Sequence, residues 1–164
     1  MSINFIFLLI IFSALCHAIW SAIIKSSRNP LSLMGITSVL EVIIFFPLTF
    51  TVPFPTLEVW YFLIATVIIH VFYRLNVIYS YRYGDLSYIY PISRGSSCLF
   101  IAIISILFLK SDVNLTGFIG ILIVCVGLFI ISFSKNISFN IRGFSLAVST
   151  AFLITAYTLV DGVG

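Results

Sequence analysis

Long apolar stretches separated by short polar ones dominate this sequence. Six of them come close to the ~20 residues that an α-helix needs to cross the hydrocarbon of a bilayer. They cover residues 3–24, 31–52, 59–80, 88–109, 115–133 and 144–160. Only 8% of the 164 residues are charged, against roughly 25% in soluble domains. The pattern predicts an all-α integral membrane protein with about six transmembrane helices, in which short connections make neighbouring helices antiparallel.

Several function classes find no support in the sequence. The formal net charge is only +3, and the basic residues are scattered along the sequence. We therefore expect no nucleic-acid partner. Cys16, Cys98 and Cys125 each lie in an apolar span without metal-ligand spacing, and we interpret them as packing residues. We find no paired carboxylates, nucleophile elbow or phosphate loop. We therefore expect no enzyme, no metal and no cofactor.

Ionisable residues inside the apolar spans are the candidate functional residues. A charge at mid-membrane costs a few kcal/mol on insertion scales, so it is a functional hypothesis by default. Five residues meet this description, and we predict that they bind solute: Arg94, Glu41, His70, Arg74 and His17.

Each of these residues also has a structural interpretation. Arg94 lies about two turns into its helix, where its long side chain can also reach back to the interface or form an ion pair. His70 and Arg74 are one turn apart and share a helix face. Glu41 can carry a proton or form an ion pair with Arg94 or Arg74. His17 can serve as an interhelical hydrogen-bonding group.

Small residues predict how two of the helices pack, because helices in lipid associate through small side chains. The fourth span places Pro91, Gly95, Cys98, Ala102 and Ser105 on one face. We expect Pro91 and Gly95 to shape a flexible helix, since proline frees a backbone carbonyl. In the fifth span Gly117, Gly120 and Gly127 share a face. The two helices should pack closely against each other or against a partner.

The first and sixth spans end in a similar way. Residues 18–25 and 155–162 each place an aromatic residue after a small one, then an apolar run, then a charge at the membrane edge. This similarity indicates that the sixth span begins a second copy of a five-helix unit. Transporters are commonly built from such duplications in inverted topology.

The chain resembles the EamA-domain branch of the drug/metabolite transporter superfamily in four places. His17 to Trp20 with Lys25 resembles the end of that family's first helix, and residues 83–95 resemble the start of its fourth. Residues 117–127 resemble its fifth helix. Gly143 through Gly162 resembles the first helix of its second repeat.

The resemblance implies a ten-helix fold of two inverted five-helix repeats that moves small metabolites across the plasma (inner) membrane. It assigns residues 1–135 to the first repeat and 143–164 to the start of a second, truncated one. The chain would then be a fragment of a longer protein or the product of an interrupted reading frame. Its partners would be a small-molecule solute, the lipid bilayer, and the remaining half of the transporter or a second copy.

The orientation in the membrane stays open at this point. With the N-terminus outside, five basic residues face the cytoplasm against Lys110 alone outside, which the positive-inside rule favours. The resemblance implies an N-terminus inside. The alternative function is that of a non-transporting assembly or regulatory partner in the membrane. Its glycine faces would bind another polypeptide, and Arg94 would be expendable.

Overall fold

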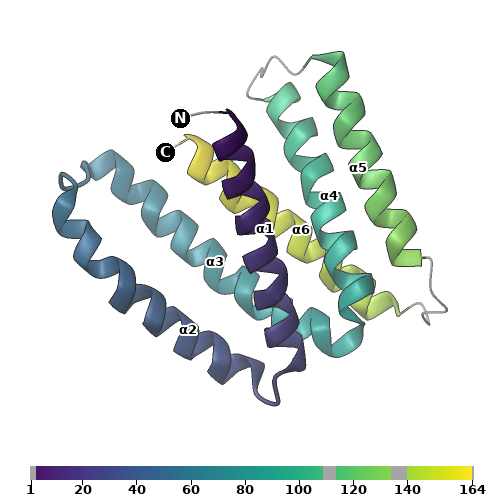
Figure 1. Ribbon diagram of the computed structural model, residues 1–164, viewed down its shortest axis with the longest axis horizontal. Helices are drawn as coiled ribbons and strands as arrows, with labels where there is room; N and C mark the ends of the chain where they lie inside the picture. Colours follow the sequence, from purple (N-terminus) through teal and green to yellow (C-terminus); the bar gives the residue numbers. More distant parts are fainter. Residues whose placement is uncertain (1–2, 109–113, 134–139, 164) are drawn as a thin grey trace. The chain divides into compact units, whose positions relative to one another are not determined.

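The computed structural model describes residues 3–108, 114–133 and 140–163, where helices joined by short connections are formed and no strand occurs. The elements in chain order are α1 (Ile3–Ser26), α2 (Pro30–Phe45), the 3₁₀ helix η1 (Phe46–Thr51), α3 (Leu57–Tyr83), α4 (Leu86–Leu107), α5 (Leu115–Phe133) and α6 (Ile141–Val163). Within these ranges, six helical stretches are long and apolar enough to cross a membrane. The predicted fold class is therefore confirmed (Figure 1).

Two helices differ in detail from the apolar spans. The second span is an α-helix only to Phe45 and continues as η1, where Pro47 lies. Proline has no N–H to donate to the carbonyl four residues earlier, and its ring crowds the preceding turn. The sixth helix begins at Ile141 and runs to Val163, so Asp161 belongs to the helix and does not follow it. Lys110 and Lys135, used above for the orientation, lie outside the described residues.

Asparagine side chains cap three of the helices. The Asn29 side chain accepts from the Ser32 N–H, with Pro30 at the first helical position. The Asn114 Oδ1 accepts from the Gly117 N–H at 2.7 Å, and the Asn140 Oδ1 accepts from the Arg142 N–H at 3.0 Å. Each cap satisfies a backbone donor that the first helical turn leaves open. The helix starts therefore follow from local sequence.

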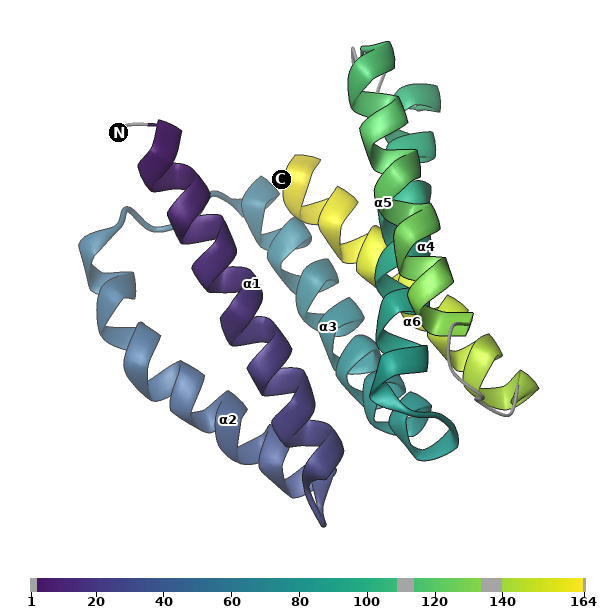
Figure 2. The same ribbon diagram turned by 45° about the vertical axis from the view of Figure 1, so that its right-hand side comes forward.

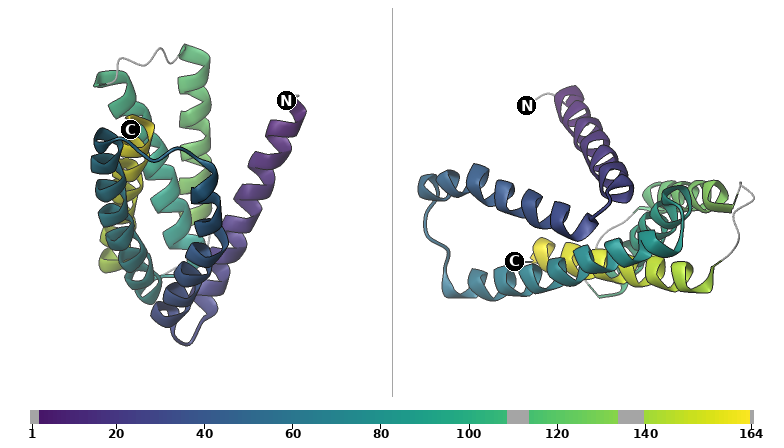
Figure 3. Two further views of the ribbon diagram at one scale, coloured as in Figure 1. Left: turned by 90° about the vertical axis from the view of Figure 1, so that its left-hand side faces the viewer. Right: turned by 90° about the horizontal axis from the view of Figure 1, so that it is seen from below.

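The chain divides into two compact units, Met1–Pro47 and Leu48–Gly164. The first unit contains α1 and α2, which meet at their short connection and spread apart from it (Figure 3). Most large apolar side chains of both helices are exposed. In a membrane protein such side chains face lipid or another polypeptide. The predicted boundary between two repeats, at residues 135–143, concerns sequence repeats and not these compact units, and it stays a prediction.

In the second unit, α6 organises the packing. It contacts both α3 and α4, and α4 in turn contacts α5 (Figures 1 and 2). Buried residues concentrate on these helices, including Tyr73, Ile92, Ala147 and Ala151. A stacked ring pair, Phe100 on α4 and Phe152 on α6, has centroids 4.5 Å apart. The sixth span is thus part of the same core as the third and fourth.

A glycine allows the turn between α3 and α4 to lie directly on the start of α6. A Cβ built at Gly143 would stand 3.0 Å from the carbonyl oxygen of Tyr83 and 3.3 Å from the Cδ1 of Ile89. Because the nearest neighbour is backbone, no side-chain rotation relieves this contact. The residue after Tyr83, Gly84, has the side chain of Ile89 against it in the same way. These contacts fix the ends of three helices against one another.

The helix pair α4 and α5 packs as expected, with Gly95 at the contact. Gly95 lies against Leu128, whose Cβ would be 3.3 Å from an added Cβ, and the Cys125 thiol donates to the Gly95 carbonyl at 3.2 Å. Among the described residues, nothing lies within 4 Å of a Cβ added at Gly120 or Gly127. Any packing role for these two glycines, and for Gly117, stays a prediction.

Candidate functional site

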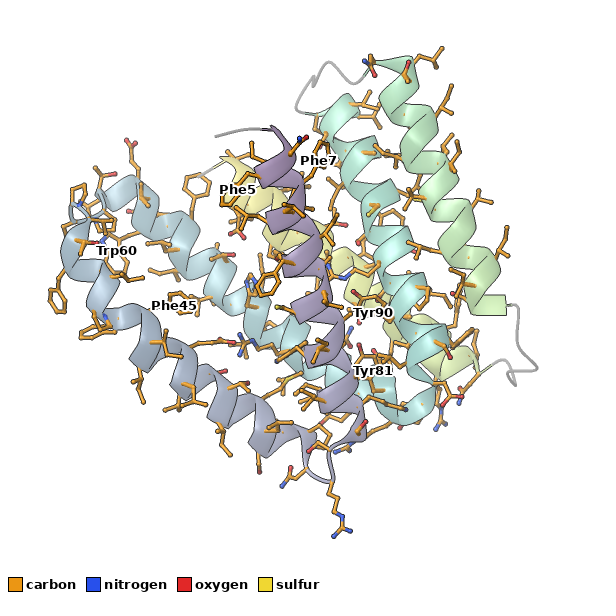
Figure 4. The ribbon with its side chains drawn as sticks, in the orientation of Figure 1. Phe5, Phe7, Phe45, Trp60, Tyr81 and Tyr90 are labelled. Carbon is orange, nitrogen blue, oxygen red and sulfur yellow. The ribbon has the colours of Figure 1, made fainter. Side chains whose placement is uncertain are left out.

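Arg94 lies in the first half of α4, partly buried among phenol rings. Its guanidinium carbon is 5.6 Å from the centroid of the Tyr90 ring, one turn earlier on the same helix. Its side chain is also within hydrogen-bonding reach of Tyr157 on α6 and interacts electrostatically with Tyr73 on α3. Figure 4 shows the labelled Tyr90 on the α4 ribbon. Three helices thus contribute aromatic hydroxyl groups around one cation, an arrangement suited to cation–π contact and to hydrogen bonding.

The imidazole of His70 joins this group from α3. Its ring centroid is 4.3 Å from that of Tyr157 and 6.2 Å from that of Tyr73. Tyr73 and Tyr157 lie edge to face at 5.5 Å. We call Arg94, Tyr90, Tyr73, Tyr157 and His70 the α3–α4–α6 cluster. Its members combine one permanent cation, one titratable ring and three phenols.

Two further polar residues extend the cluster toward the end of α6. The hydroxyl of Thr66 donates to the Asp161 carboxylate at 2.6 Å. The His70 Nδ1 lies 2.9 Å from the carbonyl oxygen of Thr66 and 3.4 Å from its hydroxyl oxygen. A polar line therefore runs from Asp161 through Thr66 to His70, and its members come from α3 and α6 alone.

A second polar contact holds α3 and α6 together at their other ends. The Asn76 side-chain amide donates to the Leu146 carbonyl at 3.2 Å and to the Thr150 hydroxyl at 3.0 Å. The hydroxyl oxygens of Ser80 and Thr150 lie 3.3 Å apart, and both residues are buried. Such interhelical hydrogen bonds stabilise helix pairs in lipid. This group is structural, because its polar atoms are used between the two helices.

The five predicted solute-binding residues fall into different parts of the chain. Arg94 and His70 come together through Tyr73 and Tyr157. Arg74, partly buried one turn after His70, acts electrostatically on Tyr73. Glu41 and His17 belong to the first unit. Glu41 is exposed on α2, and His17 stacks on Trp20 of its own helix at 5.6 Å.

Two hollows of the described chain lie away from these residues. One, of about 560 Å³, is lined by apolar and serine side chains of residues 19–33, and the other, of about 420 Å³, lies along α5 between Ile119 and Ile130. In the described ranges, no three His, Cys, Asp or Glu side chains come together as metal ligands. The candidate site is therefore defined by its converging polar side chains.

The sequence model of the EamA-like transporter family matches residues 4–133. The chain belongs to the EamA-like transporter family. No curated protein and no solved structure matches it at the significance that we required. The family match confirms the resemblance drawn from the motifs and identifies the chain as a multi-pass membrane protein of transporter type.

Sequence reasoning on this EamA-like chain missed the tyrosines and the Thr66–Asp161 pair. Tyr90 and Tyr157 lie in the residue ranges that carry the family resemblance. They did not stand out as site residues because aromatic rings in apolar spans are ordinary interface anchors. A usable signal was present in the spacing. Thr66 and His70 are four residues apart in α3, and Tyr157 and Asp161 are four apart in α6. Polar residues one turn apart share a face, so two such pairs indicate two polar faces that can meet.

Proposed function

We propose that this EamA-like chain moves a small anionic or zwitterionic metabolite across the plasma membrane, and that the solute binds at the α3–α4–α6 cluster. The arrangement of Arg94 with Tyr90 and Tyr157 carries the proposal. A guanidinium presents several N–H donors in a plane, which suits a carboxylate or phosphate group. The surrounding phenols add hydrogen-bonding groups and aromatic faces. Arg74 adds a second positive charge to the same region.

Alternating access is the mechanism that we propose for the movement. It requires a helix at the solute site that can change its contacts. Pro91 lies one turn before Gly95 in α4, and it cannot donate to the carbonyl of Ser87. Such a point lets a membrane helix bend at low cost. Because Arg94 lies between these two residues, bending there would move the cation relative to Tyr157.

Glu41 and His17 keep their predicted role as solute-binding residues from the first unit. The division into repeats at residues 1–135 and 143–164 belongs to the same proposal, since the midplane site of a repeat transporter lies where repeats meet. In that division Tyr157 comes from the second repeat and Arg94 from the first.

The test compares the small-metabolite pools of cells and their medium with and without production of the full chain, by mass spectrometry. We expect wild-type protein to shift one or a few anionic or zwitterionic metabolites across the membrane. Arg94→Ala should abolish the shift, and Glu41→Gln should weaken it. Arg94→Lys should retain part of it, because lysine keeps the charge but loses the planar donor geometry.

Arg82→Ala is the matched control. Arg82 is an exposed arginine at the end of α3, where its guanidinium carbon lies 5.3 Å from the Tyr79 ring centroid. Its loss should leave the metabolite shift in place. Equal shifts from wild type and Arg94→Ala, at equal amounts of protein in the membrane, would remove Arg94 from the solute site. No shift from wild type would favour a non-transporting membrane partner.

A further inference from the structure

The polar line from Asp161 to His70 has a defined direction of hydrogen-bond donation. A carboxylate can only accept, so the hydrogen of the Thr66 hydroxyl points to Asp161, 2.6 Å away. A backbone carbonyl can only accept too, so the His70 Nδ1, 2.9 Å from the Thr66 carbonyl, carries a hydrogen. That Nδ1–H also faces the free lone pairs of the Thr66 hydroxyl at 3.4 Å.

One tautomer of the neutral imidazole fits both of its contacts with Thr66. It has its hydrogen on Nδ1, which leaves Nε2 as a proton acceptor. The ring itself lies against Tyr157, which is within hydrogen-bonding reach of Arg94. The line therefore connects the cation of the α3–α4–α6 cluster to a carboxylate near the end of α6.

We propose that His70, Thr66 and Asp161 form a proton relay that couples proton movement to the solute site at Arg94. The proposal rests on the proposed transport function. A hydronium ion gives one proton to Nε2 of His70 and becomes water. The Nδ1 hydrogen passes to the Thr66 hydroxyl oxygen as that hydroxyl passes its own hydrogen to the Asp161 carboxylate. One proton has then entered at Nε2, and Asp161 holds one as a neutral carboxylic acid.

The starting state is restored without other reactants. Asp161 is exposed, and it releases its proton to water. Exchange of the imidazole hydrogen from Nε2 to Nδ1 through water returns His70 to its first tautomer. Rotation of the Thr66 hydroxyl then turns its O–H bond toward Asp161 again. The net result of one cycle is the passage of one proton from the Nε2 side of His70 to the end of α6.

The contacts around His70 join the relay to the solute site. Within the second unit, the His70 ring lies against Tyr157 and Tyr73, and both tyrosines interact with Arg94 of α4, beside Tyr90. The other ionisable groups here are Arg74 of α3, which acts on Tyr73, and Asp161 of α6, which accepts from Thr66. A group bound at Arg94 therefore acts on the relay through these rings, and by linkage the effect is reciprocal.

The first experiment reads the tautomer directly. The sequence contains two histidines, His17 and His70. In the full chain carrying His17→Gln, ¹⁵N-histidine labelling therefore reports on His70 alone by NMR in lipid nanodiscs. We expect neutral His70 to show a protonated Nδ1 and an unprotonated Nε2. Protonation of Nε2 instead would overturn the relay.

The second experiment uses the proton itself as the probe. The full chain is reconstituted into vesicles of phosphatidylcholine and phosphatidylglycerol that contain the pH indicator pyranine, and a pH step is applied with the membrane potential clamped by potassium and valinomycin. We expect protein-dependent acidification of the lumen. Thr66→Val and Asp161→Asn should lose most of it, and Thr66→Ser, which keeps the hydroxyl, should retain it.

Two results of the vesicle experiment overturn the relay. One is acidification by wild type no faster than in protein-free vesicles, and the other is an equal rate for wild type and Thr66→Val. Neither experiment uses a solute, so the relay and the transport proposal fail separately. Loss of the metabolite shift in Arg94→Ala together with full proton flux in Thr66→Val would keep the solute site and remove the relay.

Discussion

His70 and Tyr157 lie ring against ring, with centroids 4.3 Å apart and ring planes inclined by 35°. The histidine comes from α3 and the tyrosine from α6, which are separated by two other transmembrane helices in the sequence. The pair is both a packing contact between two helices and the link between Arg94 and the Thr66–Asp161 hydrogen bond. The two roles can be separated by substitutions that remove the hydroxyl or the ring.

The first prediction concerns Tyr157. Tyr157→Phe keeps the ring against His70 and removes the hydroxyl that meets Arg94. We expect the metabolite shift to fall strongly while the melting temperature of the purified protein in detergent changes little. Tyr157→Ala should lower both, because the partly buried aromatic contact is lost as well. Equal transport by wild type and Tyr157→Phe would contradict a direct role of the hydroxyl.

The second prediction concerns Gly143. Gly143→Ala places a Cβ 3.0 Å from the Tyr83 carbonyl oxygen, and we expect it to lower the free energy of unfolding by about 1–3 kcal/mol through local overpacking. Gly162→Ala is the control, since nothing among the described residues lies within 4 Å of its added Cβ. It should be neutral or stabilising because alanine favours a helix. Unfolding by titration with a denaturing detergent measures both, and similar stability of the two variants would contradict the close contact.

The third prediction concerns the hydrogen bonds of Thr150. Thr150→Val preserves shape but removes the group that accepts from Asn76 at 3.0 Å. We expect a loss of about 0.6–1.7 kcal/mol in the same detergent titration, the range of interhelical hydrogen bonds in lipid. Thr116→Val on the exposed start of α5 is the same chemical change at a residue that makes no interhelical hydrogen bond to the described part of the chain. It should have a much smaller effect.

The fourth prediction separates two glycines of the α4–α5 pair. Gly95→Val forces a branched side chain against Leu128 and Cys125, so it should separate the helices and lower the melting temperature clearly. Gly127→Val adds a side chain where no described residue lies within 4 Å of the new Cβ, and it should be tolerated by the isolated chain. If cross-linking from a cysteine placed at 127 captures a second copy and Gly127→Val abolishes that capture, the glycine face binds a partner.

Several features could be predicted from the sequence because they depend on local properties. Hydropathy and span length identify six membrane helices, and Pro47 explains why the second one changes type. Asparagine at 29, 114 and 140 marks three helix starts. Arg94 and His70 stood out because a polar group inside an apolar span is costly by itself. None of these conclusions requires knowledge of which helices touch.

The contacts that join these residues were decided by the tertiary structure. In a membrane, side chains that face lipid and side chains that face the core are both apolar, so the sequence of a span does not reveal its inner face. The joining of Arg94 to Tyr157 and of Thr66 to Asp161 depends on how α3, α4 and α6 are rotated and cross. The helices and their isolated polar residues follow from local sequence alone, whereas helix packing establishes which of those residues meet.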